Sequence, residues 1–225
     1  CALEIGPGVG VLTKELALRA EKVLTIEIDE TLLPVLDETL GEFDNVEIIN
    51  RDIMKADLEK IIEEKCAGMR LAVCANLPYN ITSPVIMMLL ESRLPFESVT
   101  VMVQKEAADR LCAEVGSRDG GAVTVAVNYY AESEKLFFVG RESFTPPPKV
   151  DSEVIRLRIR KAPPVNIADE ARFFKVVKAA FSQRRKTAEN SLSAGLGIPK
   201  AEAAEALEKT GLEKTVRAEK LTMAD

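Results

Sequence analysis

Residues 4–10 read EIGPGVG and stand between the apolar run CALEI and the helix-like segment LTKELALRA. Glycine adopts positive φ without steric cost, and its missing Cβ lets a ligand touch the backbone beside a helix N-terminus. A buried strand, a glycine turn and a helix in this order predict the first unit of an α/β fold. A glycine turn with a purely structural role is the alternative.

Periodicity extends this pattern along the chain, because strand-like apolar runs alternate with helix-like amphipathic segments. The strand-like runs are CALEI, KVLTIEI, NVEIIN, RLAVCA, SVTVMVQ and KLFFVG, and the helix-like ranges are 13–20, 31–40, 58–65, 83–93 and 105–115. This alternation predicts a mostly parallel, doubly wound sheet, whose ligands bind beyond the carboxyl ends of the strands.

The pattern changes after residue 144. FTPPPKV is stiff and extended because three prolines fix φ, and SEVIRLRIR alternates as a strand near a sheet edge does. KAPPVN resembles a linker, and amphipathic helical segments follow from residue 169 onward. We predict a main α/β domain over 1–162 and a small all-α domain over 163–225.

The amino-acid composition limits the class of protein to which the chain can belong. Of 225 residues, 47% are apolar and 29% charged, which is usual for a soluble globular chain. No apolar run approaches the ~20 residues of a membrane span, and no cleavable leader opens the chain. We expect a cytoplasmic monomer. Since the first residues already look like a strand, we also expect natural residues upstream of them.

The four cysteines are scattered without a C-x-x-C pair, and the chain has no histidine. Clustered nitrogen and sulfur ligands are therefore lacking, so we predict no metal site. Ser-His and Cys-His nucleophilic schemes are excluded as well. Four reduced, mostly buried thiols are the expected state in a cytosolic protein.

The spacing of Gly6, Gly8 and Gly10 separates two classes of nucleotide-binding protein. The dinucleotide pattern G-x-G-x-x-G fails, because its third glycine falls on Val11 or Thr13. A nicotinamide oxidoreductase is therefore disfavoured. The pattern E-x-G-x-G-x-G instead resembles the first motif of Rossmann-like methyltransferases, which use S-adenosylmethionine.

Acidic residues follow the next two strands. Glu27, beside Ile28, ends the second strand and can accept both ribose hydroxyls of a nucleoside. Asp52, beside Ile53, follows the third strand and can accept from an adenine amine. Acids at strand ends are common singly, but glycines, Glu and Asp on three consecutive strand ends indicate a nucleoside cofactor.

The fourth strand ends in Asn76, Leu77, Pro78 and Tyr79, which match the N-x-P-Y motif of amino-methyltransferases. An aromatic amine is a poor nucleophile because its lone pair is delocalised into the ring. If the Asn76 side-chain oxygen and the Pro78 carbonyl each accept one N–H, the lone pair is directed toward a methyl donor. Tyr79 offers a stacking face for the base. Positioning and electrostatics then suffice, without a strong general base.

Longer segments make the resemblance specific. LEIGPGVGVLTKELA, IEID, RDIMKAD, ANLPYNITSPVIMMLL, FTPPPKVDSEVIRL and FSQRRKTAENSL resemble, in this order, the ribosomal RNA adenine dimethyltransferase family. They are most similar to its bacterial small-subunit branch, which is associated with kasugamycin sensitivity. The resemblance covers essentially the whole chain.

The resemblance implies transfer of two methyl groups to N6 of each of two adjacent adenosines, in a hairpin loop near the 3′ end of 16S rRNA. The donor is S-adenosylmethionine, the product S-adenosylhomocysteine, and the substrate belongs to the immature 30S subunit. The family's cofactor residues map onto Gly6, Glu27, Asp52 and Asn76. Its target-base residues map onto 76–79 and onto Phe144, a second aromatic surface. A Gln-Asn-Phe-Leu-type segment that members carry upstream of the first strand is not in this sequence.

Charge is distributed unevenly along the chain. Residues 1–144 carry 14 Lys and Arg against 25 Asp and Glu, whereas residues 145–188 carry 11 against 4. Basic residues neutralise phosphates, so we predict that the acidic body holds the chemistry and the basic end grips RNA. The predicted RNA contacts are Lys149, Arg184, Arg185 and Lys186. A merely solvated helix face is the alternative for the basic cluster.

Two rivals remain. A large-subunit rRNA methylase of the antibiotic-resistance type shares the chemistry, although FTPPPKVDS and the helical tail favour the small-subunit enzyme. An assembly factor that binds the immature small subunit, with methylation secondary, is the other. The two roles are compatible, since a slow enzyme that leaves only after its substrate matures acts as a checkpoint.

Overall fold

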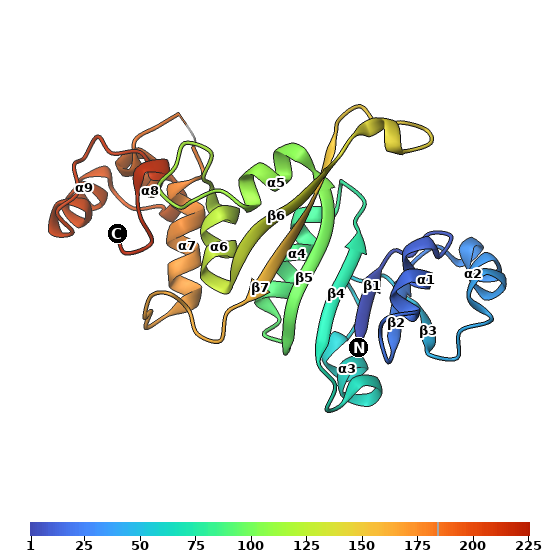
Figure 1. Cartoon of the computed structure of the whole chain (residues 1–225). Coiled ribbons are helices and arrows are strands. Elements are labelled where there is room, and N and C mark those ends of the chain that lie inside the picture. Colours follow the sequence, from blue (N-terminus) through green and yellow to red (C-terminus); the bar gives the residue numbers. More distant parts are fainter. Residues whose placement is uncertain (184) are drawn as a thin grey trace. The chain divides into compact units, whose positions relative to one another are not determined.

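The structure, a computed structural model, describes residues 1–183 and 185–225 (Figure 1). These residues form two compact units. The sheet unit comprises Cys1–Ala108 and Glu132–Ile159, and the helical unit comprises Asp109–Ala131 and Arg160–Asp225. The chain thus enters the helical unit twice. The domain boundary between residues 162 and 163 remains a prediction.

A seven-stranded sheet forms the centre of the described sheet unit, in the order β3-β2-β1-β4-β5-β7-β6. Its strands are β1 (Ala2–Ile5), β2 (Val23–Glu27), β3 (Val46–Asn50), β4 (Leu71–Asn76), β5 (Phe96–Gln104), β6 (Ala131–Val139) and β7 (Ser152–Ile159). The pairs among β1 to β5 are parallel, and β5 pairs with β7 antiparallel. The predicted mostly parallel sheet is therefore confirmed.

Helices connect the parallel strands. They are α1 (Val11–Ala17), α2 (Leu33–Leu40), α3 (Leu58–Cys66), α4 (Thr82–Glu91) and α5 (Lys105–Leu111), with 3-10 turns η1 (Glu30–Leu32) and η2 (Arg141–Ser143). The chain steps outward from β1 to β3 and then returns to β4 on the other side of β1. Right-handed crossovers consequently place helices on both faces, which is the doubly wound arrangement.

Burial explains why the central strands read as continuous apolar runs. Every residue of β1 and β2 is buried, as expected where helices cover both faces of a parallel sheet. β6 lies at the edge and is mostly exposed, including Phe137 and Phe138. The sheet therefore has a protected centre, where the order of the strands reverses beside β1 and β4.

The helical unit contains α6 (Ala122–Tyr130), α7 (Glu170–Ala180), α8 (Ala188–Leu196), α9 (Lys200–Lys209) and the 3-10 turn η3 (Ala218–Lys220). The predicted C-terminal helices are confirmed, but α6 was not predicted. Tyr130 of α6 stacks on Phe174 of α7 with centroids 5.5 Å apart, and Tyr129 meets Phe174 edge-on at 5.3 Å. These rings join the two segments that build the unit.

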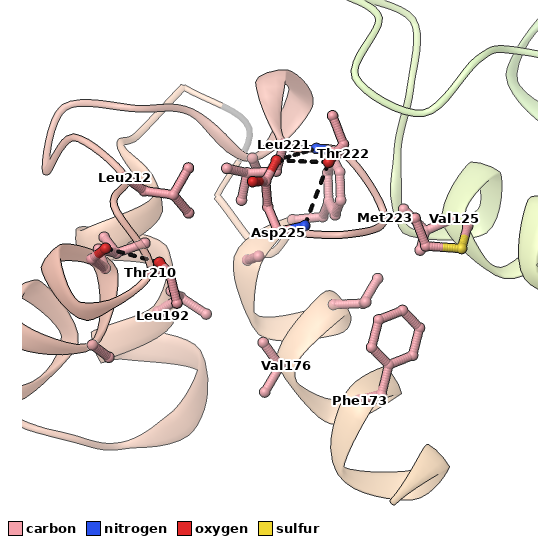
Figure 2. A pocket seen from close by; sticks show the side chains of 16 residues that line it. Val125, Phe173, Val176, Leu192, Thr210, Leu212, Leu221, Thr222, Met223 and Asp225 are labelled. Atoms are coloured by element: carbon pink, nitrogen blue, oxygen red, sulfur yellow. Dashed lines mark hydrogen bonds between the residues drawn. The ribbon is translucent and has the colours of Figure 1, made fainter. Parts of the chain in front are cut away.

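A cavity of about 240 Å³ lies inside the helical unit (Figure 2). Its lining is mostly apolar, and Phe173, Val176 and Met223 are among the side chains around it. The carboxylate of Asp225 accepts from the backbone N–H and the hydroxyl of Thr222. A lining of this kind does not suit a charged nucleoside cofactor.

Candidate active site

The ends of the parallel strands bring the predicted site residues together at one edge of the sheet. Glu4 in β1 pairs with Thr25 on one side and with Cys74 on the other. Two positions further along these neighbouring strands lie Gly6, Glu27 and Asn76. These three predicted residues, separated by up to 70 positions in sequence, therefore stand at one level at the carboxyl ends of β1, β2 and β4.

The glycine turn has two different halves. Gly6 and Gly8 have φ of 68° and 59°, and a Cβ at either would meet no atom within 4 Å. Gly10 has φ of 87°, and a Cβ there would lie 3.2 Å from Thr39 and 3.3 Å from Leu36. The first two glycines thus leave an open backbone surface, while the third lets α2 pack closely. An open surface beside the start of α1 fits the carboxylate end of an amino-acid-bearing cofactor.

Glu27 is 5% exposed at the end of β2. Its Oε1 accepts from the backbone N–H of Asp29 at 2.9 Å, which fixes the carboxylate. Its carbonyl accepts from the Asn50 amide at 2.9 Å and from the Arg51 backbone N–H at 3.0 Å. The ends of β2 and β3 are therefore tied together, and the carboxylate retains acceptor capacity for hydroxyl groups.

Asp52 lies just beyond β3. Its Oδ1 accepts from the Met54 backbone N–H at 2.9 Å, and its Oδ2 lies 3.7 Å from the Lys55 ammonium. Ile53 is buried, whereas Ile28, which follows Glu27, is 64% exposed. The exposed Ile28, next to the fixed Glu27 carboxylate, offers an apolar surface for a base, and the cofactor roles of these residues stay predictions.

Asn76 is exposed at the end of β4, while Leu77 is 1% exposed and anchors the turn in the core. The Pro78 carbonyl accepts from the Ile81 backbone N–H and from the Thr82 hydroxyl, both at 3.1 Å. Two donors within the chain thus already engage the carbonyl that the sequence predicts as an acceptor for the target amine. The role of the Pro78 carbonyl toward the target amine stays a prediction.

A long-range contact holds Tyr79. Its hydroxyl lies 2.9 Å from the Ser152 hydroxyl, across 73 positions of sequence. Ser152 is fully buried at the start of β7 and pairs with Gln104 at the carboxyl end of β5. Because β7 runs antiparallel, its first residue reaches the edge where the parallel strands end. The Tyr79 ring is thereby fixed at that edge.

The loop between β6 and β7 brings Phe144 toward the same edge. Phe144 follows η2 and is half-buried. The Arg141 backbone N–H donates to Oδ1 of Asp151 at 3.1 Å, and Asp151 precedes β7. The loop is thus tied to the start of the strand whose first residue, Ser152, holds Tyr79.

A buried polar cluster lies beneath the glycine turn. Oε2 of Glu4 and the hydroxyls of Thr13 and Thr25 are buried without a hydrogen-bond partner among the described residues. Burial raises the pKa of Glu4; the neighbouring Thr13 and Thr25 hydroxyls partly offset this, and the charge of Glu27 adds to it. Glu4 therefore favours the neutral acid more strongly than an exposed glutamate does.

The predicted RNA contacts belong to both units. Lys149 is exposed in the sheet unit, and Arg185 and Lys186 are exposed in the helical unit. Arg184 lies outside the described residues. Over the described parts of the chain, no three potential metal-ligating side chains gather. Each helix found there is too short or too polar to traverse a bilayer.

Two functional contacts had no local sequence signal. Ser152 looks like an ordinary strand residue until the sheet pairs it with the far end of β5. Asn50 looks like a strand end, and only the parallel pairing shows that it holds the Glu27 carbonyl. Pairing between distant strands was needed to find both.

A glycine turn on β1, a fixed carboxylate on β2 and an Asn-x-Pro-Tyr turn on β4, at one edge of a mostly parallel sheet, resemble the arrangement in Rossmann-like methyltransferases. The family model described as "Ribosomal RNA adenine dimethylase" matches residues 2–225. The chain therefore belongs to the ribosomal RNA adenine dimethylase family. The predicted fold class and rRNA adenine dimethyltransferase activity are confirmed with it.

Individual relatives agree. The chain is 51% identical to "Ribosomal RNA small subunit methyltransferase A" of Geobacillus thermodenitrificans, over all of this chain and 78% of the relative. It resembles the crystal structure of a dimethyladenosine transferase from Plasmodium falciparum with a TM-score of 0.79 and 29% identity, covering 100% of this chain and 86% of that one. It resembles the 23S rRNA methyltransferase ErmE with a TM-score of 0.68 and 31% identity, covering 97% and 84%.

Proposed function

We propose that the chain transfers methyl groups from S-adenosylmethionine to N6 of two adjacent adenosines, in the 3′-terminal hairpin loop of 16S rRNA. It acts in the cytoplasm, as a monomer, on the immature 30S subunit and contributes to the biogenesis of that subunit. One observation carries the proposal: the parallel register sets Asn76 level with the glycine turn and Glu27. An amide oxygen therefore stands where a donor on β1 and β2 would meet an acceptor.

The residues at the carboxyl edge fit the cofactor. Gly6, Gly8 and Gly10 shape the turn for its amino-acid end, and Glu27 is fixed with acceptor capacity for ribose hydroxyls. Asp52, with Ile28 and Ile53, would hold the adenine. When bound, the cofactor supplies a methyl group already activated by a positive sulfur. No side chain has to act as a strong base, and the chain contains no histidine.

The Asn76 side-chain oxygen accepts one N–H of the target amine. We assign the second acceptor to the carbonyl of Leu77, because two donors within the chain already engage the carbonyl of Pro78. Leu77 is buried and holds the turn rigid. Two fixed acceptors draw the amine toward tetrahedral geometry, and such preorganised contacts cost no rearrangement during the reaction.

Tyr79 and Phe144 stack on the flipped adenine. Base stacking on an aromatic side chain contributes ~1–3 kcal/mol, which offsets part of the cost of removing a base from its stack. The Tyr79 hydroxyl bond to Ser152 fixes one ring in advance. Lys149, Arg184, Arg185 and Lys186 contact phosphates of the rRNA.

The proposal is tested by incubating the protein with labelled methyl donor and under-methylated small subunits, followed by nucleoside analysis. We expect dimethyladenosine at the two 3′-terminal hairpin positions from the wild type and none from Asn76→Ala. Asn166→Ala, an exposed asparagine outside the sheet unit, is the matched control and should retain activity. Label in another nucleoside, or full activity of Asn76→Ala, would refute the proposal.

The similarity to a 23S rRNA methyltransferase makes large-subunit rRNA the alternative substrate to test. Under-methylated large subunits are therefore included in the same assay, and we expect no incorporation there. Binding of Asn76→Ala to small subunits separates the enzymatic role from the assembly role. If growth of the host depends only on binding, assembly is the dominant function.

A further inference from the structure

Two thiols from distant segments meet on the sheet unit. Cys1 stands immediately before β1, and Cys66 is the last residue of α3. Their sulfur atoms lie 2.7 Å apart. Cys1 is half-buried and Cys66 is 2% exposed. The pair is a property of the fold, because 65 positions of sequence separate its members.

We propose that Cys1 and Cys66 form a site of reversible oxidation to a disulfide. With a peroxide as oxidant, the Cys1 thiolate attacks one peroxide oxygen and the O–O bond breaks; with one proton taken up, this leaves a sulfenic acid and water. The second thiol then attacks that sulfur and displaces a second water. Two thiols lose two electrons and two hydrogens, and the peroxide is reduced to two molecules of water.

Accessibility sets the order of the two steps. Cys1 is half-buried, whereas Cys66 is enclosed, so Cys1 is the more accessible of the two thiols. Burial raises the pKa of the Cys66 thiol, which suits it to the second step rather than to direct attack on peroxide. Cys74 differs from this pair, since it lies inside β4, at the centre of the sheet. The S–S bond needs about 2.05 Å, so a small shift of the side chains completes it.

The position of the pair determines its effect. Cys1 lies at the amino end of β1, next to the pair Ala2 and Ala72, and therefore at the edge opposite Asn76. The cross-link would enclose the segment that carries the glycine turn, Glu27 and Asp52. It should restrain the unfolded chain without reaching the reacting atoms. The oxidised protein should therefore be more heat-resistant and equally active.

The experiment treats the full chain with stoichiometric hydrogen peroxide and maps its peptides without reduction. We expect a linked pair of peptides containing Cys1 and Cys66, with the loss of two hydrogens, and a rise in Tm of roughly 5–10 °C that a reductant reverses. Cys74→Ser should give the same linked peptides. Cys66→Ser should give neither the link nor the rise in Tm.

If Cys66→Ser fails to fold, the peptide map of the wild type alone tests whether the Cys1–Cys66 disulfide forms. Separate unlinked thiols, over-oxidised Cys1, or a disulfide between two chains would each overturn the proposal. Methyl transfer by the oxidised protein is measured alongside. A linked protein whose activity falls more than about twofold would overturn the inferred separation of the cross-link from the site.

Discussion

Tyr79 shows how one hydrogen bond can prepare a site. Its hydroxyl contacts the buried Ser152 hydroxyl at 2.9 Å, so the orientation of the ring is set by a residue that touches no substrate. The ring itself supplies the stacking surface. The two contributions can therefore be removed separately, which makes their relative size measurable.

We predict that Tyr79→Phe lowers kcat/KM for methyl transfer by about 3–10-fold, because the ring remains but loses its tether of ~1 kcal/mol. Tyr79→Ala should lose on the order of 100-fold through the absent stacking surface. Ser152→Ala is the matched control for the tether. The double variant Tyr79→Phe/Ser152→Ala should be no worse than either single one, and additive losses would contradict the shared bond.

Glu4 predicts a pH dependence of stability. Its pKa in the folded protein is raised above the ordinary value of 4.5, chiefly by burial. Folding therefore favours the protonated acid, and this contribution is complete below the ordinary value and lost as pH rises through the raised one. Glu4→Gln mimics the neutral acid. Its Tm relative to the wild type should increase as pH rises above the ordinary value and level off once pH has passed the raised pKa of Glu4.

Thermal unfolding at a series of pH values checks this prediction. Glu63→Gln, on an exposed position of α3, is the control and should follow the wild-type pH profile. If Glu4→Gln were destabilised equally at every pH, Glu4 would be ionised and held by hydrogen bonds in the folded protein.

At the scale of elements, the glycine turn joins β1 to α1, and its positions differ in how strictly each requires the absence of a side chain. Gly8 requires positive φ but has open space around it, whereas Gly10 also lies against Leu36 and Thr39 of α2. Side chains at positive φ cost roughly 1 kcal/mol, and crowding adds to that cost. The turn therefore separates ligand contact from helix packing.

We predict that Gly10→Ala lowers the free energy of unfolding by about 2–3 kcal/mol, and Gly8→Ala by only about 1 kcal/mol. The order should reverse in binding experiments normalised to folded protein, with Gly8→Ala weakening cofactor binding more. Urea unfolding and calorimetric titration with S-adenosylmethionine measure the two effects. Equal destabilisation by both substitutions would show that α2 moves away from position 10.

The strands and most helices could be predicted because local pattern and burial agree. β1 and β2 read as continuous apolar runs since both faces are covered. α6 was missed because AVTVAVNYY is rich in β-branched and aromatic residues, which favour strands. In the structure it is buried on most of its surface, with Tyr129 and Tyr130 packed on α7. Tertiary packing thus overrides local propensity there.

At the scale of the whole molecule, basic and acidic regions are segregated along the chain, with 14 Lys and Arg against 25 Asp and Glu in residues 1–144. Arg185 and Lys186 are exposed in the helical unit. Several of the other basic residues of that unit pair with acids, as Lys209 does with Glu205. Charge reversals at ion-paired positions can therefore serve as controls for charge reversals at the proposed rRNA contacts.

We predict that Arg185→Glu/Lys186→Glu weakens binding to small subunits. The slope of log K against log salt concentration should fall in magnitude by about 1–2, because each lost phosphate contact contributes ~0.7–0.9 to that slope. Lys209→Glu/Lys214→Glu changes the net charge equally at ion-paired positions and is the control. Filter binding at several salt concentrations measures both. An equal loss of slope in the two variants would mean that net charge, rather than a specific contact, governs binding.

The candidate site could be predicted where its residues follow strand ends, because parallel strands deliver their carboxyl ends to one edge. Gly6, Glu27 and Asn76 are of this kind. The choice of main-chain acceptor could not be predicted, since the donors from Ile81 and Thr82 to Pro78 depend on the turn geometry. The contacts of the antiparallel strand β7 could not be predicted either, because no local sequence feature shows which strand runs antiparallel.

The Tyr79–Ser152 bond has a consequence for how the chain tolerates change. The chain leaves the sheet unit at Ala108 and re-enters it at Glu132, so the intervening residues form an excursion between two anchored ends. The anchor depends on strand pairing and not on the length of that excursion. Insertions between α5 and α6, within 112–121, should therefore leave the base-stacking ring in register and the packing of α6 on α7 intact.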